Sequence, residues 1–130
     1  SYTGLRIGLA AAKGLCFAWG RPLLGVPAVE ALAEEALLGG GAQDVVVVMD
    51  ASRGQVHAAR FAGTPTGVVR TVAAGLWDPA ELREALLGAG AARPLPTLVG
   101  DAAAAVADPA RGLVAGALAW PTAERVARVA

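Results

Sequence analysis

Residues 2–20 read YTGLRIGLAAAKGLCFAWG, and the interpretation of the rest of the chain depends on this stretch. Its small and apolar residues recur with a helical period, which predicts one long helix capped by Thr3. Glycine costs up to about 1 kcal/mol relative to alanine inside a helix, yet Gly4, Gly8 and Gly14 all fall within it. Such small residues let another backbone approach, so we expect close packing against a strand or a partner helix.

The opposite face of this expected helix carries two cations, Arg6 and Lys13, seven residues apart and nearly aligned. The first carboxylate in the chain is Glu30, so no nearby acidic residue in the sequence neutralises them. They either bind a partner or an anion, or extend from an ordinary surface helix with their stems packed along it. Gly20 is expected to end the helix in a left-handed conformation.

Composition limits the possible classes of protein. The chain has 130 residues, of which 55% are hydrophobic, which suits one compact domain. The net charge is zero, so we expect no direct binding to nucleic acid. Cys16 is the only cysteine, which excludes an intramolecular disulfide and favours the cytoplasm. The longest uncharged run, residues 112–123, is too short to span a membrane, which takes about 20 residues.

Beyond the lead helix, alternating patterns predict an α/β domain with a mixed sheet and one clear hairpin. The apolar run at residues 45–49 indicates a strand buried on both faces, and residues 50–54 form a turn to its partner. Asp78, Pro79 and Glu81 form a capping box that begins a helix. Strands are expected at residues 22–26, 45–49, 55–61, 68–73 and 97–99, a loop at 63–67, and further helices at 27–38, 102–107 and from Pro121.

Several motifs carry a family resemblance. They are SYTGLRIG at residues 1–8, AKGL at 12–15, PLLGV at 22–26 and EALA at 30–33, together with the hairpin pattern at 45–56. These motifs resemble the TsaB (YeaZ) family, bacterial proteins once labelled glycoprotease-like that assist synthesis of threonylcarbamoyladenosine in transfer RNA. After Phe61 the resemblance is mostly architectural.

The resemblance implies a fold and a division of the chain. The fold is the later part of an actin-like ATPase (ribonuclease H-like) fold, a mixed sheet with flanking helices. Residues 1–130 would be a single partial domain, with residues 1–43 ending an N-terminal lobe and residues 44–130 forming the C-terminal lobe. In the family an earlier lobe precedes the position of Ser1, and this sequence does not include it. We therefore interpret the chain as a processed, excised or truncated product.

The resemblance also implies partners. The lead helix would form the surface that pairs with a second copy or with the catalytic paralogue TsaD, and a TsaE-like ATPase would join the assembled complex. We expect no cofactor on this chain, with ATP and the metal bound by the TsaD-like partner. Carried over by position, the partner-interface or helix-packing residues are Thr3, Gly4, Arg6, Gly8 and Lys13.

A second set of candidate residues lies in the hairpin turn. Asp50, Arg53 and Gly54 form either a local ion pair in a capped turn or part of the mouth of an interlobe cleft. The family commonly has glutamate where Gln55 stands and an aromatic residue where His57 stands. The missing carboxylate argues against acid–base chemistry at this turn.

Other catalytic chemistry has little support in the sequence. His57 and Cys16 are the only residues of their types, so one chain cannot assemble a zinc site from cysteine and histidine ligands. We expect Cys16 to be buried within its helix, and the tryptophans to pack in the core or at helix ends. The serines include no Gly-x-Ser-x-Gly motif.

Phosphate binding has two weak candidates, residues 39–41 and 99–101, neither of which matches a nucleotide-binding motif. Asp101 would also repel a phosphate. Three hypotheses therefore remain open. They are a non-catalytic scaffold subunit that pairs with TsaD, a diverged actin-like ATPase or glycoprotease-like peptidase, and a truncated self-associating domain without autonomous activity.

Overall fold

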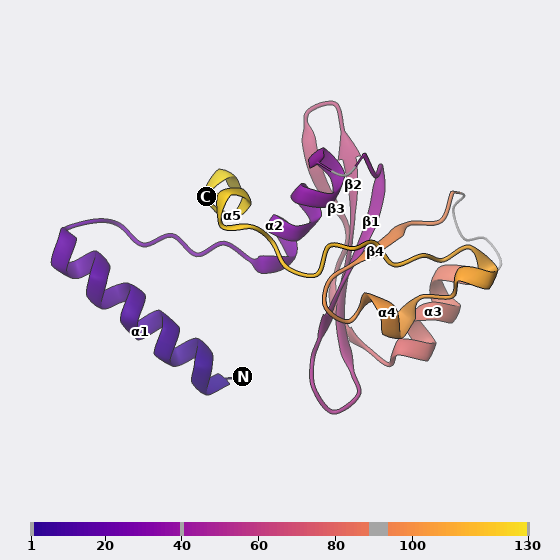
Figure 1. Cartoon of the computed structure of the whole chain (residues 1–130), viewed down its shortest axis with the longest axis horizontal. Helices are drawn as coiled ribbons and strands as arrows, with labels where there is room; N and C mark the ends of the chain where they lie inside the picture. The colour runs from indigo at the N-terminus through magenta and orange to yellow at the C-terminus, as the bar shows by residue number, and fades with distance from the viewer. Residues whose placement is uncertain (1, 40, 89–93, 130) are drawn as a thin grey trace.

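The computed structural model describes residues 2–39, 41–88 and 94–129. One long helix, four strands and several short helices follow one another along the chain (Figure 1). The elements are α1 (Tyr2–Trp19), α2 (Ala28–Glu34), the π-helical turn η1 (Glu35–Gly39), β1 (Asp44–Asp50), β2 (Val56–Thr64), β3 (Gly67–Trp77), α3 (Pro79–Leu87), β4 (Thr97–Val99), α4 (Ala103–Val106), the 3-10 turn η2 (Pro109–Arg111) and α5 (Ala123–Val129).

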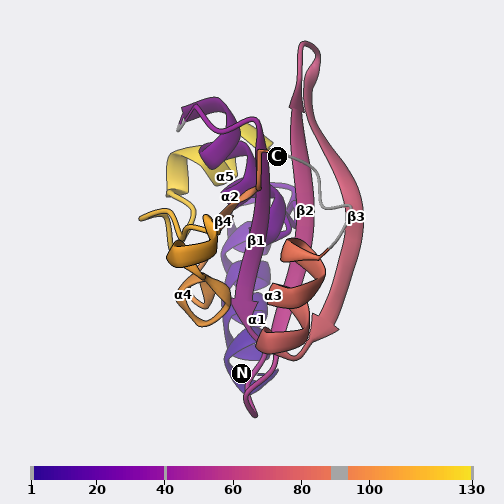
Figure 2. The same cartoon turned by 90° about the vertical axis from the view of Figure 1, so that its right-hand side faces the viewer.

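The four strands form one mixed sheet in the order β3-β2-β1-β4, with β3 at one edge (Figure 2). β1 pairs antiparallel with β2 and parallel with β4, and β2 pairs antiparallel with β3. Residues 114–118 lie alongside β4, where the Gly116 amide donates to the Leu98 carbonyl at 2.7 Å. The mixed α/β architecture predicted from the sequence is therefore confirmed.

Each face of the sheet buries a separate hydrophobic core. The alternation of the β1 valines sends Val46 and Val48 to one face and Val45 and Val47 to the other. Figure 1 shows α3 and α4 on the first face and α2 and α5 on the second. Burial on both faces explains why the strand predicted at residues 45–49 is continuously apolar, and β1 confirms that strand.

The helix predicted at Asp78 is also confirmed. The Asp78 carboxylate accepts hydrogen bonds from the backbone amides of Ala80 and Glu81, at 2.8 and 3.4 Å, and Pro79 occupies the first turn. Arg83 then donates through Nε to the Val106 carbonyl at 2.9 Å, which fixes α3 to the end of α4. The expected strand at residues 97–99 is β4.

Several predicted boundaries are wrong. Residues 22–26 are extended but belong to no strand and are largely exposed, because no described strand lies beside them to pair with. The predicted loop at 63–67 is only a tight turn, in which the Thr64 hydroxyl donates to the Gly67 carbonyl at 2.8 Å. The strand predicted at 68–73 continues to Trp77, and the last helix begins at Ala123 instead of Pro121.

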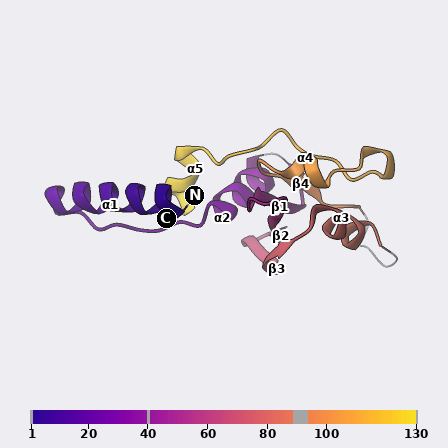
Figure 3. The same ribbon diagram turned by 90° about the horizontal axis from the view of Figure 1, so that it is seen from below.

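The lead helix differs from its prediction in where it packs. α1 lies to one side of the sheet and is joined to it by an extended segment, residues 20–27 (Figures 1 and 3). The helix has no buried residue, and no atom lies within 4 Å of the position that a Cβ on Gly8 would occupy. The expected close packing against a strand is therefore not found within the described chain. Thr3 is not the cap, because the helix already begins at Tyr2.

The end of α1 follows the prediction. Gly20 has a φ of +60°, and its amide donates to the Phe17 carbonyl while that of Arg21 donates to the Cys16 carbonyl. These two bonds form a Schellman motif, which requires a residue that tolerates the left-handed conformation. Among the residues described, no helix is both long and apolar enough to cross a membrane.

The expected burial of Cys16 is also wrong, and two of the three tryptophans lie outside the core. Cys16 is half-buried, and its thiol donates to the Pro22 carbonyl at 3.8 Å. Trp19 and Trp120 are 69% and 61% exposed, whereas Trp77 packs against the core below α3. Neither Cys16 nor Trp19 is buried, because α1 packs against no other described helix or strand.

One exposed ion pair gives the fold a pH-dependent contact. Arg111 of η2 donates to the Glu84 carboxylate of α3 at 2.6 Å, and this bond lowers the pKa of Glu84 from its ordinary value of 4.5. A carboxylate with a lowered pKa stabilises the fold above its unfolded value and loses that contribution as pH falls below about 4.5. Glu84→Gln is therefore expected to reduce the acid-side loss of stability. Melting temperatures of the wild-type and Glu84→Gln proteins, measured from neutral pH to below 4.5, would test this expectation. An equal fall in melting temperature for both proteins would contradict a stabilising role for the ion pair.

Candidate functional site

The α1 surface exposes large apolar side chains on all sides. Phe17 is 91% exposed and Tyr2 76%, while Leu5, Ile7 and Trp19 each exceed 60%. Single exposed apolar residues are common on soluble proteins, but several large ones on a single helix indicate an interaction site. α1 is therefore the element of the described chain that most requires a partner surface.

The predicted partner-binding residues lie together on α1. Thr3 and Arg6 line a shallow surface cavity of about 330 Å³ with Ile7 and Ala10. The Arg6 guanidinium lies over the Tyr2 ring, 5.6 Å from its centre, one helical turn away. Such a cation–π contact holds the arginine along the helix while leaving its charge exposed. Gly4, Gly8 and Lys13 are on the same helix, none of them buried.

The turn between β1 and β2 contains three consecutive residues in the left-handed conformation, which glycine adopts most easily. Ser52, Arg53 and Gly54 have φ values of 66°, 55° and 78°. The Asp50 carboxylate accepts a hydrogen bond from the Ser52 amide at 3.0 Å, which is the capped turn expected from the sequence. Within the described residues Arg53 makes no ion pair with Asp50, so that part of the local interpretation is wrong.

The structure also joins two features that the sequence presented separately. The Asp50 amide donates to the Asp101 carboxylate at 3.0 Å, so both acidic residues meet at the carboxyl ends of the parallel strands β1 and β4. The available signal was that each aspartate closely follows a predicted strand. Two carboxylates at this edge make it acidic, which disfavours a bare phosphate.

Gly100 makes this meeting of strands possible. It has a φ of +114°, and a Cβ at this position would lie 2.1 Å from the Val48 carbonyl oxygen. Any side chain would therefore displace the loop that carries Asp101. Gly39 and Gly41 of the other phosphate candidate lie near the start of β1, at the opposite end of the sheet, and Gly40 is outside the described residues.

His57 and Cys16 lie on different elements. His57 is exposed on β2, opposite Met49 and Leu76, whereas Cys16 lies on α1 to the side of the sheet (Figure 1). They do not form a thiol–imidazole pair in this structure. In the part of the chain that is described, no group of three or more histidine, cysteine or acidic residues could hold a metal ion.

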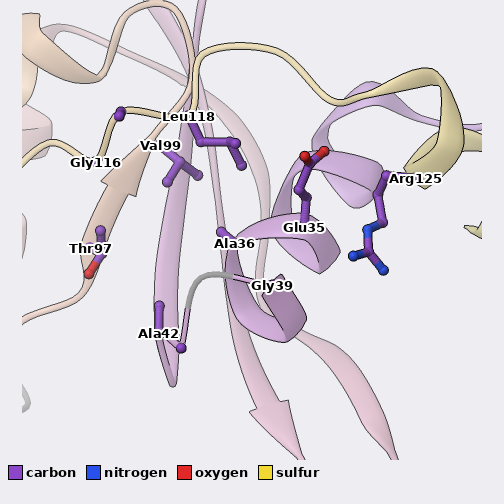
Figure 4. Close-up of a pocket in the computed structure, with 11 residues that line it drawn as sticks. Glu35, Ala36, Gly39, Ala42, Thr97, Val99, Gly116, Leu118 and Arg125 are labelled. Carbon is purple, nitrogen blue, oxygen red and sulfur yellow. The ribbon is translucent and has the colours of Figure 1, made fainter.

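Sequence reasoning missed a cavity with a volume of about 620 Å³, which is shown in Figure 4. It lies between η1, β4, residues 116–118 and the first turn of α5. Glu35 and Arg125 contribute its charged side chains, and the remaining lining is mostly small and apolar. No sequence signal could reveal it, because its residues come from four separate parts of the chain.

The family comparison covers most of the chain. Residues 1–106 match the family model described as "TsaD: tRNA N6-adenosine threonylcarbamoyltransferase". A curated relative from Escherichia coli (strain K12), "tRNA threonylcarbamoyladenosine biosynthesis protein TsaB", is 34% identical over 68 residues. That match spans 52% of this chain but only 29% of the relative.

Two solved structures share the fold. One, "YeaZ from Pseudomonas aeruginosa", has a TM-score of 0.75 at 23% identity, and the other, an uncharacterized protein with similarity to peptidase YeaZ from the same organism, has 0.73 at 22%. Each comparison covers 99% of this chain and 59% of the solved chain. The fold class inferred from the sequence, the actin-like and ribonuclease H-like architecture, is therefore confirmed. Because residues 1–106 match its model, the chain belongs to the family described as TsaD, and it is similar to the TsaB and YeaZ proteins named above.

Proposed function

We propose that this chain is a non-catalytic scaffold in the cytoplasmic pathway that makes threonylcarbamoyladenosine at adenosine 37 of transfer RNA. In this proposal α1 pairs with a TsaD-type catalytic subunit, which holds ATP and the metal. A TsaE-like ATPase joins the assembled complex, and this chain does not contact the RNA directly. Support for the pathway comes from the family match over residues 1–106 and from the name of the relative in Escherichia coli.

The observation that carries the proposal is the exposure of α1. An 18-residue helix without one buried residue, with aromatic side chains at both ends, has surface to offer a partner. Aromatic residues and arginine are the types enriched at the centres of protein interfaces, and α1 displays Tyr2, Arg6, Phe17 and Trp19. A second copy of this chain is the other occupant that the same surface would fit.

Charge reversal on α1 tests the proposal. Arg6→Glu is expected to weaken binding to the TsaD of the same organism about tenfold or more, because it reverses a charge at the interface and removes the Tyr2 contact. The melting temperature should not change, since α1 contributes nothing to the core. Copurification and titration calorimetry would measure the loss.

Arg53→Glu is the matched control, because it makes the same charge change at an exposed site in the turn between β1 and β2. It is expected to leave binding intact. If Arg53→Glu weakens binding to TsaD and Arg6→Glu does not, the interface lies at the turn between β1 and β2 and not on α1. Capture of TsaD by neither the wild-type chain nor a longer form of it would reject the scaffold role.

A further inference from the structure

Arg125 leaves hydrogen-bond donors unused in a sheltered position. Its side chain is only 20% exposed, and its guanidinium makes no hydrogen bond to any described residue. Its Nη1 forms a long ion pair with Oε2 of Glu34 at 4.0 Å, which is beyond hydrogen-bond distance. That oxygen is itself buried without a hydrogen-bond partner among the described residues. Because guanidinium donors are hydrated in water, sheltering them without an acceptor is unfavourable.

Glu35 provides an opposite charge in the same cavity. Its Oε2 accepts a hydrogen bond from the Thr122 amide at 2.8 Å, which ties α5 to η1. Glu35 and Arg125 form no ion pair with each other, although both line the cavity of about 620 Å³. Figure 4 shows both side chains on the same side of this cavity, with Gly39 near Arg125. One acid and one base therefore border the cavity without neutralising each other directly.

The remaining wall of the cavity is small and apolar. Ala36, Ala42, Val99 and Leu118 supply most of it, and Gly116 adds no side chain. A Cβ at Gly116 would come within 3.4 Å of both Thr97 Cγ2 and Val99 Cγ1, so a larger residue there would crowd this wall. The volume falls within the range of small-molecule sites, which combine an apolar lining with a few polar groups.

We propose that this cavity binds an α-amino acid with an aliphatic side chain. The carboxylate would accept hydrogen bonds from Arg125, the ammonium group would donate to Glu35, and the side chain would contact Ala36, Ala42 and Leu118. A simple anion would meet the repulsion of Glu34 and Glu35, and a simple cation would meet that of Arg125. A zwitterion can pair with both Arg125 and Glu35, and it adds no net charge to the site. This inference does not depend on the pairing of α1.

Titration with leucine and two of its fragments tests the proposal. L-leucine added to the ¹⁵N-labelled protein is expected to cause saturable chemical-shift changes at the amides of Ala36, Ala42 and Val99. Isocaproate, which lacks the ammonium group, and isopentylamine, which lacks the carboxylate, should each bind at least about tenfold more weakly. Isocaproate or isopentylamine binding as tightly as leucine would overturn the assignment of the two charges.

Three variants locate the site. Arg125→Met and Glu35→Gln are each expected to weaken leucine binding at least about tenfold. A side-chain amide oxygen can still accept from the Thr122 amide, so Glu35→Gln keeps the bond that ties α5 to η1. Ala42→Leu should abolish binding by filling the cavity without changing a charge.

Arg111→Met is the control, because it removes the same charge from η2, outside the cavity, and should bind leucine normally. Absence of saturable shifts with leucine, shifts outside the cavity, or unchanged binding by Arg125→Met and Ala42→Leu would overturn the proposal.

Discussion

Replacing Gly100 by alanine is expected to lower the free energy of unfolding by more than about 3 kcal/mol. The new Cβ would lie 2.1 Å from the Val48 carbonyl oxygen, far inside van der Waals contact, and φ at this residue is +114°. Relief requires the loop after β4 to move away from β1. That movement would break the 2.7 Å bond from the Gly100 amide to the Leu118 carbonyl.

Gly67→Ala is the matched control for this effect. Gly67 has a φ of +135°, which alanine also avoids, but no atom lies within 4 Å of its Cβ position. Its substitution is expected to cost about 1–3 kcal/mol from backbone strain alone. Urea denaturation of both variants would separate steric overlap from strain. Equal losses would show that the contact with Val48 is relieved at little cost.

Gly100→Ala also has a consequence for the acidic edge. Displacement of the loop would separate the Asp101 carboxylate from the Asp50 amide, which now donates to it at 3.0 Å. The α1 surface lies on a different element and would not change directly. If folded Gly100→Ala protein can be obtained at low temperature, its unchanged binding to TsaD would support an interface on α1 and not at the strand ends.

Phe61→Ala is expected to cost about 3–5 kcal/mol. Phe61 is 2% exposed and belongs to the core between the sheet and α2, where it packs with Leu32, Ala33 and Leu37. Removal of its ring leaves a cavity, and it also removes the ring that Arg70 covers at 5.6 Å from its centre. Thermal and urea denaturation followed by circular dichroism would measure the loss.

Two further substitutions serve as comparisons for the stability loss expected from Phe61→Ala. Phe61→Leu keeps most of the volume and is expected to cost less than about 1.5 kcal/mol. Val72→Ala, at a residue that is 50% exposed on the edge strand β3, should change stability by no more than about 0.5 kcal/mol. A loss from Phe61→Ala no larger than that from Val72→Ala would mean that the α2 face does not form a rigid core.

The sequence predicted the elements whose signals are local. The valine run of β1, the cap at Asp78 and the glycine end of α1 each depend on residues within a few positions of one another. Their physical causes, which are side-chain periodicity, capping bonds and glycine backbone freedom, act over the same short range. The division of the chain at residues 43 and 44, and the assignment of Thr3, Gly4, Arg6, Gly8 and Lys13 to a partner interface, stay predictions.

The sequence misled wherever a residue pattern fits more than one environment. The apolar residues at 22–26 suit a buried strand, but a strand also needs a neighbouring strand with which to form hydrogen bonds. The local sequence pattern does not show whether such a neighbour is present. The small residues of α1 suit close packing, but the described chain supplies no surface against which they pack. In both cases the composition indicated a contact without identifying the other side of it.

By itself, the sequence determined the lead helix, the buried central strand with its hairpin partner, and the family resemblance. Only the tertiary structure decided that Asp50 meets Asp101, that α1 stands apart from the sheet, and that Glu35 and Arg125 line one cavity. The reason is sequence separation: Asp50 and Asp101 are 51 positions apart, and parallel pairing of β1 with β4 brings them together. Local preferences fix each element, whereas burial of both sheet faces fixes which distant residues become neighbours.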